Sequence, residues 1–188
     1  MSHSPDAGPD VGPDLGPDVV GAGAEVLPPR GATVVRTTGR MLPVRSDGRV
    51  LLLRGWDPDT PDDPFWFTVG GGVDPGETHL DAAVRELFEE TGIVVHPADV
   101  TPELTRYGVE FSWSGRWIVQ DLVYFAVLVP DHATTTFDGL DGAERQSIDS
   151  AAWLTPDELV ATGEAGGDLR LVEAVRTAVA RVLGDAGR

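Results

Sequence analysis

The chain has 188 residues, of which 41% are hydrophobic, so it is long enough to fold as one domain with a hydrophobic core. Its formal net charge is −17 at pH 7, which disfavours long nucleic acid as a partner because a polyanion would be repelled. The absence of cysteine excludes disulfide bonds, thiolate metal sites and cysteine nucleophiles.

The first residues do not resemble a targeting signal. No apolar run reaches the ~20 residues that span a bilayer, and no basic start precedes an apolar block, so we expect a cytoplasmic protein. The tripeptide Gly-Pro-Asp recurs at residues 8–10, 12–14 and 16–18. This composition buries too little apolar surface to fold, so residues 1–30 are predicted to be a disordered tail and residues 31–188 the domain. A role of the tail as a partner-binding arm stays open.

Strand and helix signals follow one another along the remaining chain. Runs rich in β-branched and aromatic residues predict strands, at residues 33–44, 49–54, 65–69, 104–113, 117–129 and 147–154. Apolar residues at helical spacing predict helices, at residues 78–91, from 155 onward and at 168–183. We expect the glycines at 70–72 to break the third strand. The order of these elements predicts an α/β fold with a mixed β-sheet and helices packed on it.

The helix predicted over 78–91 has recognisable ends. Thr78 can cap its start together with Asp81, and Gly92 suits the position after its end. Its buried stripe is expected to consist of residues spaced three or four apart, namely Leu80, Val84, Leu87 and Thr91. A similar capping pattern, formed by Thr155 and Glu158, opens the next helix.

The first helix carries three carboxylates on one face, at Glu86, Glu89 and Glu90. Like charges repel there, and the helix dipole disfavours each anion in the last turn by roughly 0.3–1 kcal/mol. A divalent cation such as Mg²⁺, Mn²⁺ or Ca²⁺ would relieve this conflict, because such ions prefer clustered oxygen ligands. Arg85 can pair with a carboxylate and hold it in place. The spacing therefore suggests a functional site, but an acidic helix face is also typical of solvated surface, so the spacing alone leaves both interpretations open.

A run of three glycines, Gly70 to Gly72, precedes this helix. Without side chains, these residues let the backbone approach a ligand closely. Their carbonyl groups can coordinate a cation, and their amide groups can contact phosphate. The run is therefore compatible with a ligand-binding loop beside the acidic helix, and an ordinary connecting loop stays the alternative until the surrounding motif is considered.

One motif covers the glycines and the acidic helix together. From Gly71 the chain reads GGVDPGETHLDAAVRELFEETGI. This stretch resembles the Nudix box, in which fixed glycine, glutamate and arginine positions are separated by variable ones. All fixed positions are matched, by Gly71, Glu77, Arg85, Glu86, Leu87, Glu89, Glu90, Gly92 and Ile93. The family usually has proline before the glycine pair, where this chain has Val69, and we expect that change to affect loop stiffness more than chemistry.

The resemblance implies a Nudix-type α/β/α sandwich and a hydrolase that acts on phosphoric anhydride bonds. Its substrate would be a nucleoside diphosphate linked to another moiety: a nucleotide sugar, ADP-ribose, a dinucleotide or a modified nucleoside triphosphate. Its cofactor would be Mg²⁺ or Mn²⁺. The expected partner is a small anionic nucleotide, with no long nucleic acid and no membrane, and a homodimer is left open.

The resemblance also implies the metal ligands and the catalytic group. By position, the ligands are the carboxylates of Glu86, Glu89 and Glu90 and the carbonyl of Gly70. Glu86 or Glu89 is the candidate general base, and Arg85 completes the catalytic group by holding carboxylates in place.

Supporting residues follow from the same resemblance. Glu77 and Arg85 are implied to brace the loop and the helix, and Gly71 and Gly92 are the further supporting residues of the motif. A further carboxylate is expected from a later loop, where three acidic residues are available: Asp138, Asp141 and Glu144. Of these we favour Glu144.

Three rival functions remain. A sensor that keeps the fold and binds a nucleotide sugar without cleaving it is the main alternative, although such domains usually lose carboxylates of the motif. Isoprenoid diphosphate isomerisation is disfavoured because, as the resemblance has it, that chemistry uses a cysteine. RNA decapping is disfavoured because the sequence shows no basic groove.

Other polar side chains have less specific signals. His79 begins the first helix, where a surface role is favoured over contact with a phosphate. Arg106 and Arg116 are candidates for binding a terminal phosphate, but a structural role is the simpler interpretation.

Overall fold

The computed structural model describes residues 33–140, 142, 144–165 and 169–185, so the tail predicted for residues 1–30 lies outside the described residues. The elements in chain order are β1 Thr33–Val44, β2 Val50–Gly55, β3 Phe65–Phe67, β4 Val69–Gly72, α1 His79–Thr91, η1 Pro97–Asp99, β5 Thr105–Trp113, β6 Arg116–Leu128, α2 Glu144–Ser147, β7 Ile148–Leu154, α3 Pro156–Thr162 and α4 Leu169–Asp185. The short helices η1 and α2 are not predicted by the sequence pattern. Within the described residues, none of the helices combines the length and the hydrophobicity that crossing a bilayer requires.

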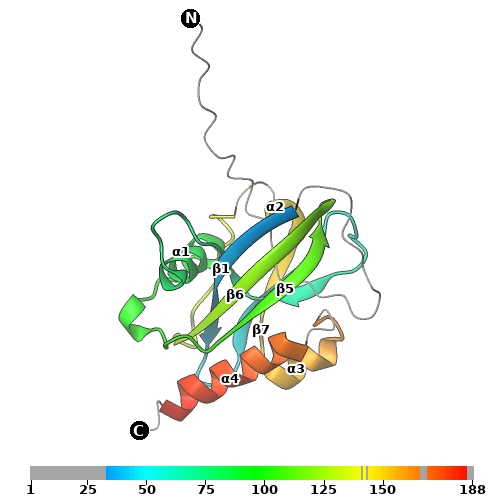
Figure 1. The fold of residues 1–188 in the computed structure, drawn as a ribbon. Coiled ribbons are helices and arrows are strands. Elements are labelled where there is room, and N and C mark those ends of the chain that lie inside the picture. The colour runs from blue at the N-terminus through cyan, green and yellow to red at the C-terminus, as the bar shows by residue number, and fades with distance from the viewer. Residues whose placement is uncertain (1–32, 141, 143, 166–168, 186–188) are drawn as a thin grey trace, which may run out of the picture.

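The strands form one mixed sheet. β1 pairs in parallel with β6 along its whole length, from Thr33↔Trp117 to Val44↔Leu128. β6 pairs antiparallel with β5, and β4 pairs antiparallel with β1 on its other side. β2 meets β1 only at Val44↔Val50 and pairs with both β3 and β7. The sheet therefore has a large part around β1 and β6 and a small part around β2, joined where β1 turns into β2 (Figure 1).

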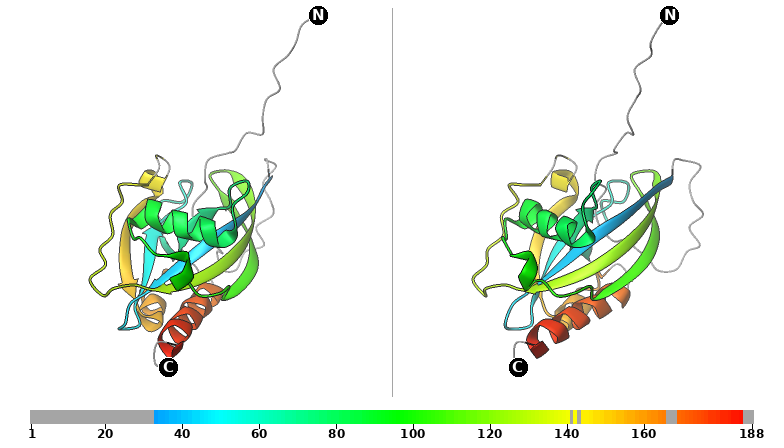
Figure 2. Two further views of the ribbon diagram at one scale, coloured as in Figure 1. Left: turned by 90° about the vertical axis from the view of Figure 1, so that its left-hand side faces the viewer. Right: turned by 60° about the vertical axis from the view of Figure 1, so that its left-hand side comes forward.

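Helices cover both faces of the sheet, with α1 on one side and α4 on the other (Figure 2). Gly39 of β1 faces α1, since a side-chain carbon at this position would lie 2.0 Å from the carbonyl oxygen of His79. Tyr107 of β5 and Thr38 of β1 are both paired with Leu122 of β6, so their side chains leave the same face of the sheet. Because Thr38 is adjacent to Gly39, that face is the one away from α1. Arg170 of α4 lies over the Tyr107 ring on that opposite face. The arrangement confirms the predicted α/β/α sandwich.

The hydrophobic core lies on both faces of the large part of the sheet. Consecutive side chains of a strand leave on opposite faces, and Met41 and Leu42 of β1 are both fully buried. Leu87 of α1 and Val175 of α4 are fully buried as well, one from each helical layer. Since apolar burial stabilises a fold by ~25 cal/mol per Å², the burial of these residues stabilises the packing of both helices on the sheet.

The glycine run does not break the third strand, contrary to the prediction. Val69–Gly72 forms a strand of its own, β4, whose residues pair with Met41 back to Thr38 of β1. The interruption falls at Thr68, before the glycines. Glycine weakens a strand but does not prevent one when a neighbouring strand supplies hydrogen-bond partners.

The buried face of α1 also differs from the predicted stripe. Leu87 and Thr91 are fully buried as expected, whereas Leu80 and Val84 are only partly buried. The buried residues of the helix are Ala82, Ala83, Glu86, Leu87, Glu90 and Thr91. The helix approaches β1 through its small alanine side chains, and this rotation carries two of the three glutamates into the protein interior.

Candidate active site

Capping hydrogen bonds hold α1 at both ends, as the sequence predicts. The Thr78 hydroxyl accepts a hydrogen bond from the Asp81 amide, and the Asp81 carboxylate accepts one from the Thr78 amide, both at 3.1 Å. At the other end, Gly92 has a left-handed φ of 72° and its amide donates to the Phe88 carbonyl at 2.8 Å. Because both ends are held, the three glutamates between them have defined positions.

The Arg85 guanidinium is the centre of the site. Its Nε and Nη2 atoms donate to the two carboxylate oxygens of Glu77, at 2.9 and 3.1 Å. Its Nη1 atom donates to Glu86 at 2.6 Å and to Glu89 at 3.0 Å. Nη2 also donates to the carbonyl oxygen of Gly72, at 2.9 Å. Arginine suits this position because its planar fork can bind several carboxylate and carbonyl oxygens at once.

Glu77 connects the loop before α1 to the helix. One of its carboxylate oxygens accepts a hydrogen bond from the Asp74 amide at 3.1 Å, and the Glu77 amide donates to the Asp74 carbonyl at 3.0 Å. The hydrogen bond from Arg85 lowers the pKa of the Glu77 carboxyl below its ordinary value, and the Asp74 amide adds to this effect. In turn, the carboxylates raise the pKa of Arg85, Glu77 first among them. Both groups are therefore charged at neutral pH.

The three glutamates of the motif differ in burial. Glu86 and Glu90 are 4% and 5% exposed, whereas the Glu89 side chain is 47% exposed. Glu90 faces the glycine-rich strand β4, where its Oε2 atom accepts a hydrogen bond from the Gly70 amide at 2.7 Å. Glu86 and Glu89 thus bind Arg85, while Glu90 binds the glycine strand, as we call β4.

Gly70 has a backbone conformation that other residues rarely adopt. Its φ is +133°, and a side-chain carbon there would lie 2.2 Å from the Gly39 carbonyl oxygen. Arg40, the partner of Gly70 in the β1–β4 ladder, donates from Nη1 to the Gly70 carbonyl and to the Thr68 carbonyl. Arg40 was not among the site residues predicted from the sequence, although a charged residue directly before Met41 and Leu42 in a predicted strand is unusual enough to indicate a role.

The donor chemistry of this region fits a hard divalent cation. Carboxylate oxygens of Glu86, Glu89 and Glu90 and the carbonyl of Gly70 are the kinds of ligand that Mg²⁺ and Mn²⁺ prefer. Among the described residues, no three acidic or histidine side chains already converge on one point as a ready-made metal cluster. Instead, Glu86 and Glu89 share one nitrogen of Arg85, and Glu90 binds the Gly70 amide.

The loop that follows β6 passes the end of α1. Its Thr136 amide donates to the Thr91 carbonyl at 2.9 Å, and a side-chain carbon at Gly139 would lie 2.0 Å from the Glu89 carbonyl oxygen. Glu144 begins α2 shortly after this loop. The side chain of Glu144 and all of Asp141 lie outside the described part of the chain, so the choice of Glu144 as a ligand stays a prediction.

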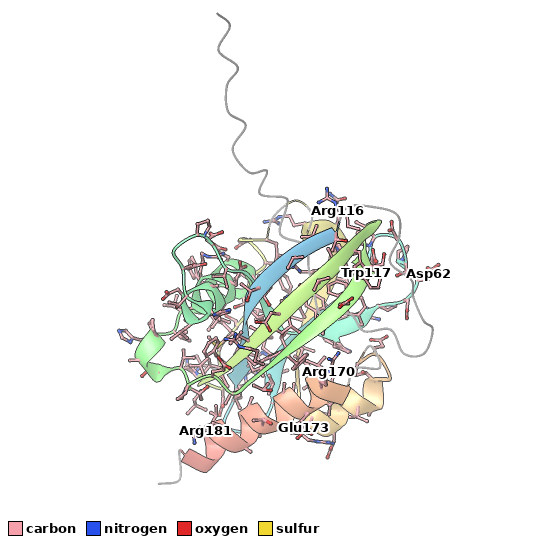
Figure 3. All side chains as sticks on the ribbon, in the orientation of Figure 1. Asp62, Arg116, Trp117, Arg170, Glu173 and Arg181 are labelled. Atoms are coloured by element: carbon pink, nitrogen blue, oxygen red, sulfur yellow. The ribbon has the colours of Figure 1, made fainter. Side chains whose placement is uncertain are left out.

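His79, Arg106 and Arg116 were the other polar candidates from the sequence. His79 Nε2 lies 2.8 Å from the Thr37 hydroxyl oxygen, which ties the start of α1 to β1. Arg106 forms ion pairs with Glu103 and Asp121, at 3.2 and 3.4 Å. Arg116 begins β6 at the end of the sheet away from α1 (Figure 3). The structure does not bring either arginine to the Arg85 network.

Comparison with known sequences gives a family match over most of the chain. The family model described as NUDIX domain matches residues 35–175. An RNA pyrophosphohydrolase of Erythrobacter litoralis is 36% identical over 112 residues, and the match spans 50% of this chain but only 61% of that protein. Nucleoside triphosphatase NudI of Salmonella typhimurium is 31% identical over 118 residues, which cover 62% of this chain and 79% of that protein.

Solved structures have the same fold. The E. coli ORF135 protein superposes with a TM-score of 0.52 at 28% identity, over 77% of this chain and 90% of that one. The E. coli dihydroneopterin triphosphate pyrophosphohydrolase gives a TM-score of 0.58 at 22% identity, over 79% and 99% of the two chains. These likenesses extend the match from the short motif to the sheet and the helices on both of its faces.

Proposed function

This chain belongs to the NUDIX domain family, and on that premise we propose that it is a metal-dependent pyrophosphohydrolase that cleaves a nucleoside diphosphate linked to another moiety. The observation that carries the proposal is the Arg85 network, in which one guanidinium binds Glu77, Glu86, Glu89 and the Gly72 carbonyl. A solvated acidic helix face needs no such network. We assign the activity to the domain at residues 31–188 and none of it to the tail at residues 1–30.

The proposed cofactor is Mg²⁺ or Mn²⁺. The groups that would hold it are the carboxylates of Glu86, Glu89 and Glu90 and the carbonyl of Gly70, with Glu144 as a further candidate. When bound, such a cation neutralises phosphate oxygens and lowers the pKa of a coordinated water.

The side chains of the chain itself would move the proton and keep the geometry. A water oxygen forms a bond to one phosphorus, the anhydride P–O bond breaks, and the other phosphate leaves with the bonding electrons. Glu89 or Glu86 accepts the proton of that water, a role that typically contributes about 10²–10⁴-fold in rate. The solvent exposure of Glu89 favours it as the base, because water can reach its carboxylate directly. Arg85 and Glu77 keep the helix and the loop in register during this step.

We place the substrate among small nucleotides rather than long RNA. One relative is named for nucleoside triphosphates and another for RNA. The formal charge of −17 disfavours a long polyanion, whereas a small substrate needs only local neutralisation. Nucleotide sugars, ADP-ribose, dinucleotides and modified nucleoside triphosphates are the classes to be compared.

A substrate panel tests the proposal. Purified protein would be incubated with each class, and with a 5′-triphosphorylated RNA, in the presence of Mg²⁺ or of a chelator. Product release that requires the metal supports the proposal and names the substrate. Tight binding of a nucleotide sugar without cleavage would instead indicate a sensor, and no turnover of any compound would overturn the assignment.

A further inference from the structure

Arg40 is a buried cation in an otherwise apolar stretch of β1. It is 2% exposed, and the next two residues along the strand, Met41 and Leu42, are fully buried. Burying a guanidinium has a large desolvation cost, so stability alone favours an apolar residue at this position. A charged residue retained against that cost points to a role beyond packing.

The Arg40 side chain is directed at the glycine strand. Its Nη1 atom donates to the carbonyl of Gly70 and, at 3.4 Å, to the carbonyl of Thr68. Gly70 lies in β4 and Thr68 directly precedes that strand, which is connected to α1 by a short loop. Arg40 therefore acts on the backbone that carries Gly70.

Gly70 is held from two directions. Its amide donates to the Glu90 carboxylate at 2.7 Å, while its carbonyl accepts from Arg40. With φ at +133°, the residue has an unusual conformation that needs such external support. The two peptide groups that meet at Gly70 are thus fixed, one by a carboxylate of the acidic helix and the other by a buried cation.

We propose that Arg40 is a positioning residue for the candidate cation site, acting through the Gly70 carbonyl. The inference rests on the proposed function. A carbonyl oxygen can accept two bonds, so the hydrogen bond from Arg40 does not prevent a cation from using the same oxygen. Arg40 orients that oxygen before the cation binds and thereby reduces the reorganisation that binding requires.

The positive charge of Arg40, taken alone, would weaken cation binding, whereas its orienting of the Gly70 carbonyl would strengthen it. A guanidinium near a bound cation repels it, so removing the charge should tighten cation binding. Removing a positioning residue should weaken binding. The direction of the change in affinity therefore separates the two roles.

Mn²⁺ binding to the full chain without nucleotide measures that direction. Free Mn²⁺ would be titrated by electron paramagnetic resonance against wild type, Arg40→Met and the control Arg45→Met. Arg45 is a suitable control because it also donates to a backbone carbonyl, that of Ala133 at 2.6 Å, but away from the glycine strand. We expect Arg40→Met to weaken Mn²⁺ binding by about tenfold or more, as for other groups that orient metal ligands, and the control to stay within about twofold.

Hydrogen exchange of the metal-free protein provides a second readout. In Arg40→Met, amide exchange over residues 68–72 should be faster than in wild type, while exchange in the distant strand at residues 105–113 should not change. If Arg40→Met does not fold, Arg40→Lys decides, since lysine keeps the charge but not the planar fork. We expect the lysine variant to bind Mn²⁺ about threefold more weakly and to exchange faster over residues 68–72.

Unchanged or tighter Mn²⁺ binding in Arg40→Met, or a lysine variant equal to wild type in both readouts, would overturn the inference. If the wild-type protein still hydrolyses a compound of the panel, the proposed function stands even though the role of Arg40 does not. A wild-type protein that neither binds Mn²⁺ nor hydrolyses any compound of the panel would overturn the proposed function itself.

Discussion

Arg85 and Glu77 form a two-point ion pair, with Nε 2.9 Å from one carboxylate oxygen and Nη2 3.1 Å from the other. Glu77 lies in the loop before α1 and Arg85 lies in the middle of the helix, so the pair ties the two segments together. The same guanidinium also contacts Glu86 and Glu89. One side chain therefore joins the loop before α1 to two of the three glutamates on the acidic face.

Replacing Arg85 by lysine should impair both activity and stability. A lysine presents one point charge and cannot reproduce the fork that binds Glu77. We expect kcat/KM to fall by about 100-fold, as for other displacements near reacting groups. The free energy of unfolding should fall by about 1–2 kcal/mol, because charge-assisted hydrogen bonds are lost. Steady-state kinetics and urea unfolding check this, with the exposed pair Arg176–Asp157 as a control through Arg176→Lys. Equal losses in both variants would contradict the account.

The stability of the domain should depend on pH through Glu77. Arg85 lowers the pKa of this carboxyl, so the ionised form is favoured in the folded state. The stabilisation is fully present above the unfolded-state pKa of about 4.3 and is lost as the pH falls through the lower folded-state pKa. The difference in unfolding free energy between wild type and Glu77→Gln should therefore shrink from about pH 6 to about pH 3. A difference of constant size across this range would count against the pair.

Gly70 and Gly72 should respond differently to substitution by alanine. A side-chain carbon at Gly70 would lie 2.2 Å from the Gly39 carbonyl oxygen, and the φ of +133° is unfavourable for alanine. A carbon at Gly72 would meet no atom within 4 Å. We expect Gly70→Ala to lower the free energy of unfolding by about 2–5 kcal/mol and Gly72→Ala by less than about 1 kcal/mol. Urea unfolding measures both, and similar losses would show that the strand tolerates a side chain at Gly70.

Local features of the site could be predicted from sequence because they depend on neighbouring residues. The cap formed by Thr78 and Asp81 and the helix end at Gly92 follow from side-chain chemistry within one helical turn. The ion pair of Arg85 with Glu89 likewise follows from their i, i+4 spacing on the helix. The structure contains both helix caps and the Arg85–Glu89 ion pair.

Other features depend on contacts between segments that are distant in sequence. The hydrogen bond from Arg40 to Gly70 exists because β4 pairs with β1, and no local pattern specifies that pairing. The burial of Glu86 and Glu90 depends on which side of α1 meets Gly39. Helical periodicity predicts that the large apolar residues of α1 lie inside, but it does not indicate that the small alanines let the helix approach the strand.

The N-terminal tail should be dispensable for the proposed activity. The family match begins at residue 35, and all residues of the Arg85 network lie after it. We expect a protein that lacks residues 1–30 to keep kcat/KM and the thermal midpoint within about the scatter of replicate measurements, because no group of the site is removed. A loss of activity without a loss of stability would assign the tail a part in substrate binding.

Glu89→Gln tests the central claim most directly. Hydrolysis of the best substrate of the panel would be measured with Mg²⁺ for wild type, Glu89→Gln and the control Glu103→Gln. Glu103 is a matched control because its side chain is 46% exposed, against 47% for Glu89, and it also pairs with a nearby arginine. We predict that Glu89→Gln lowers kcat/KM by about 100-fold or more with the fold intact, while Glu103→Gln changes it by less than about twofold. Equal activity in the two variants would mean that the chemistry does not reside on the acidic face of α1.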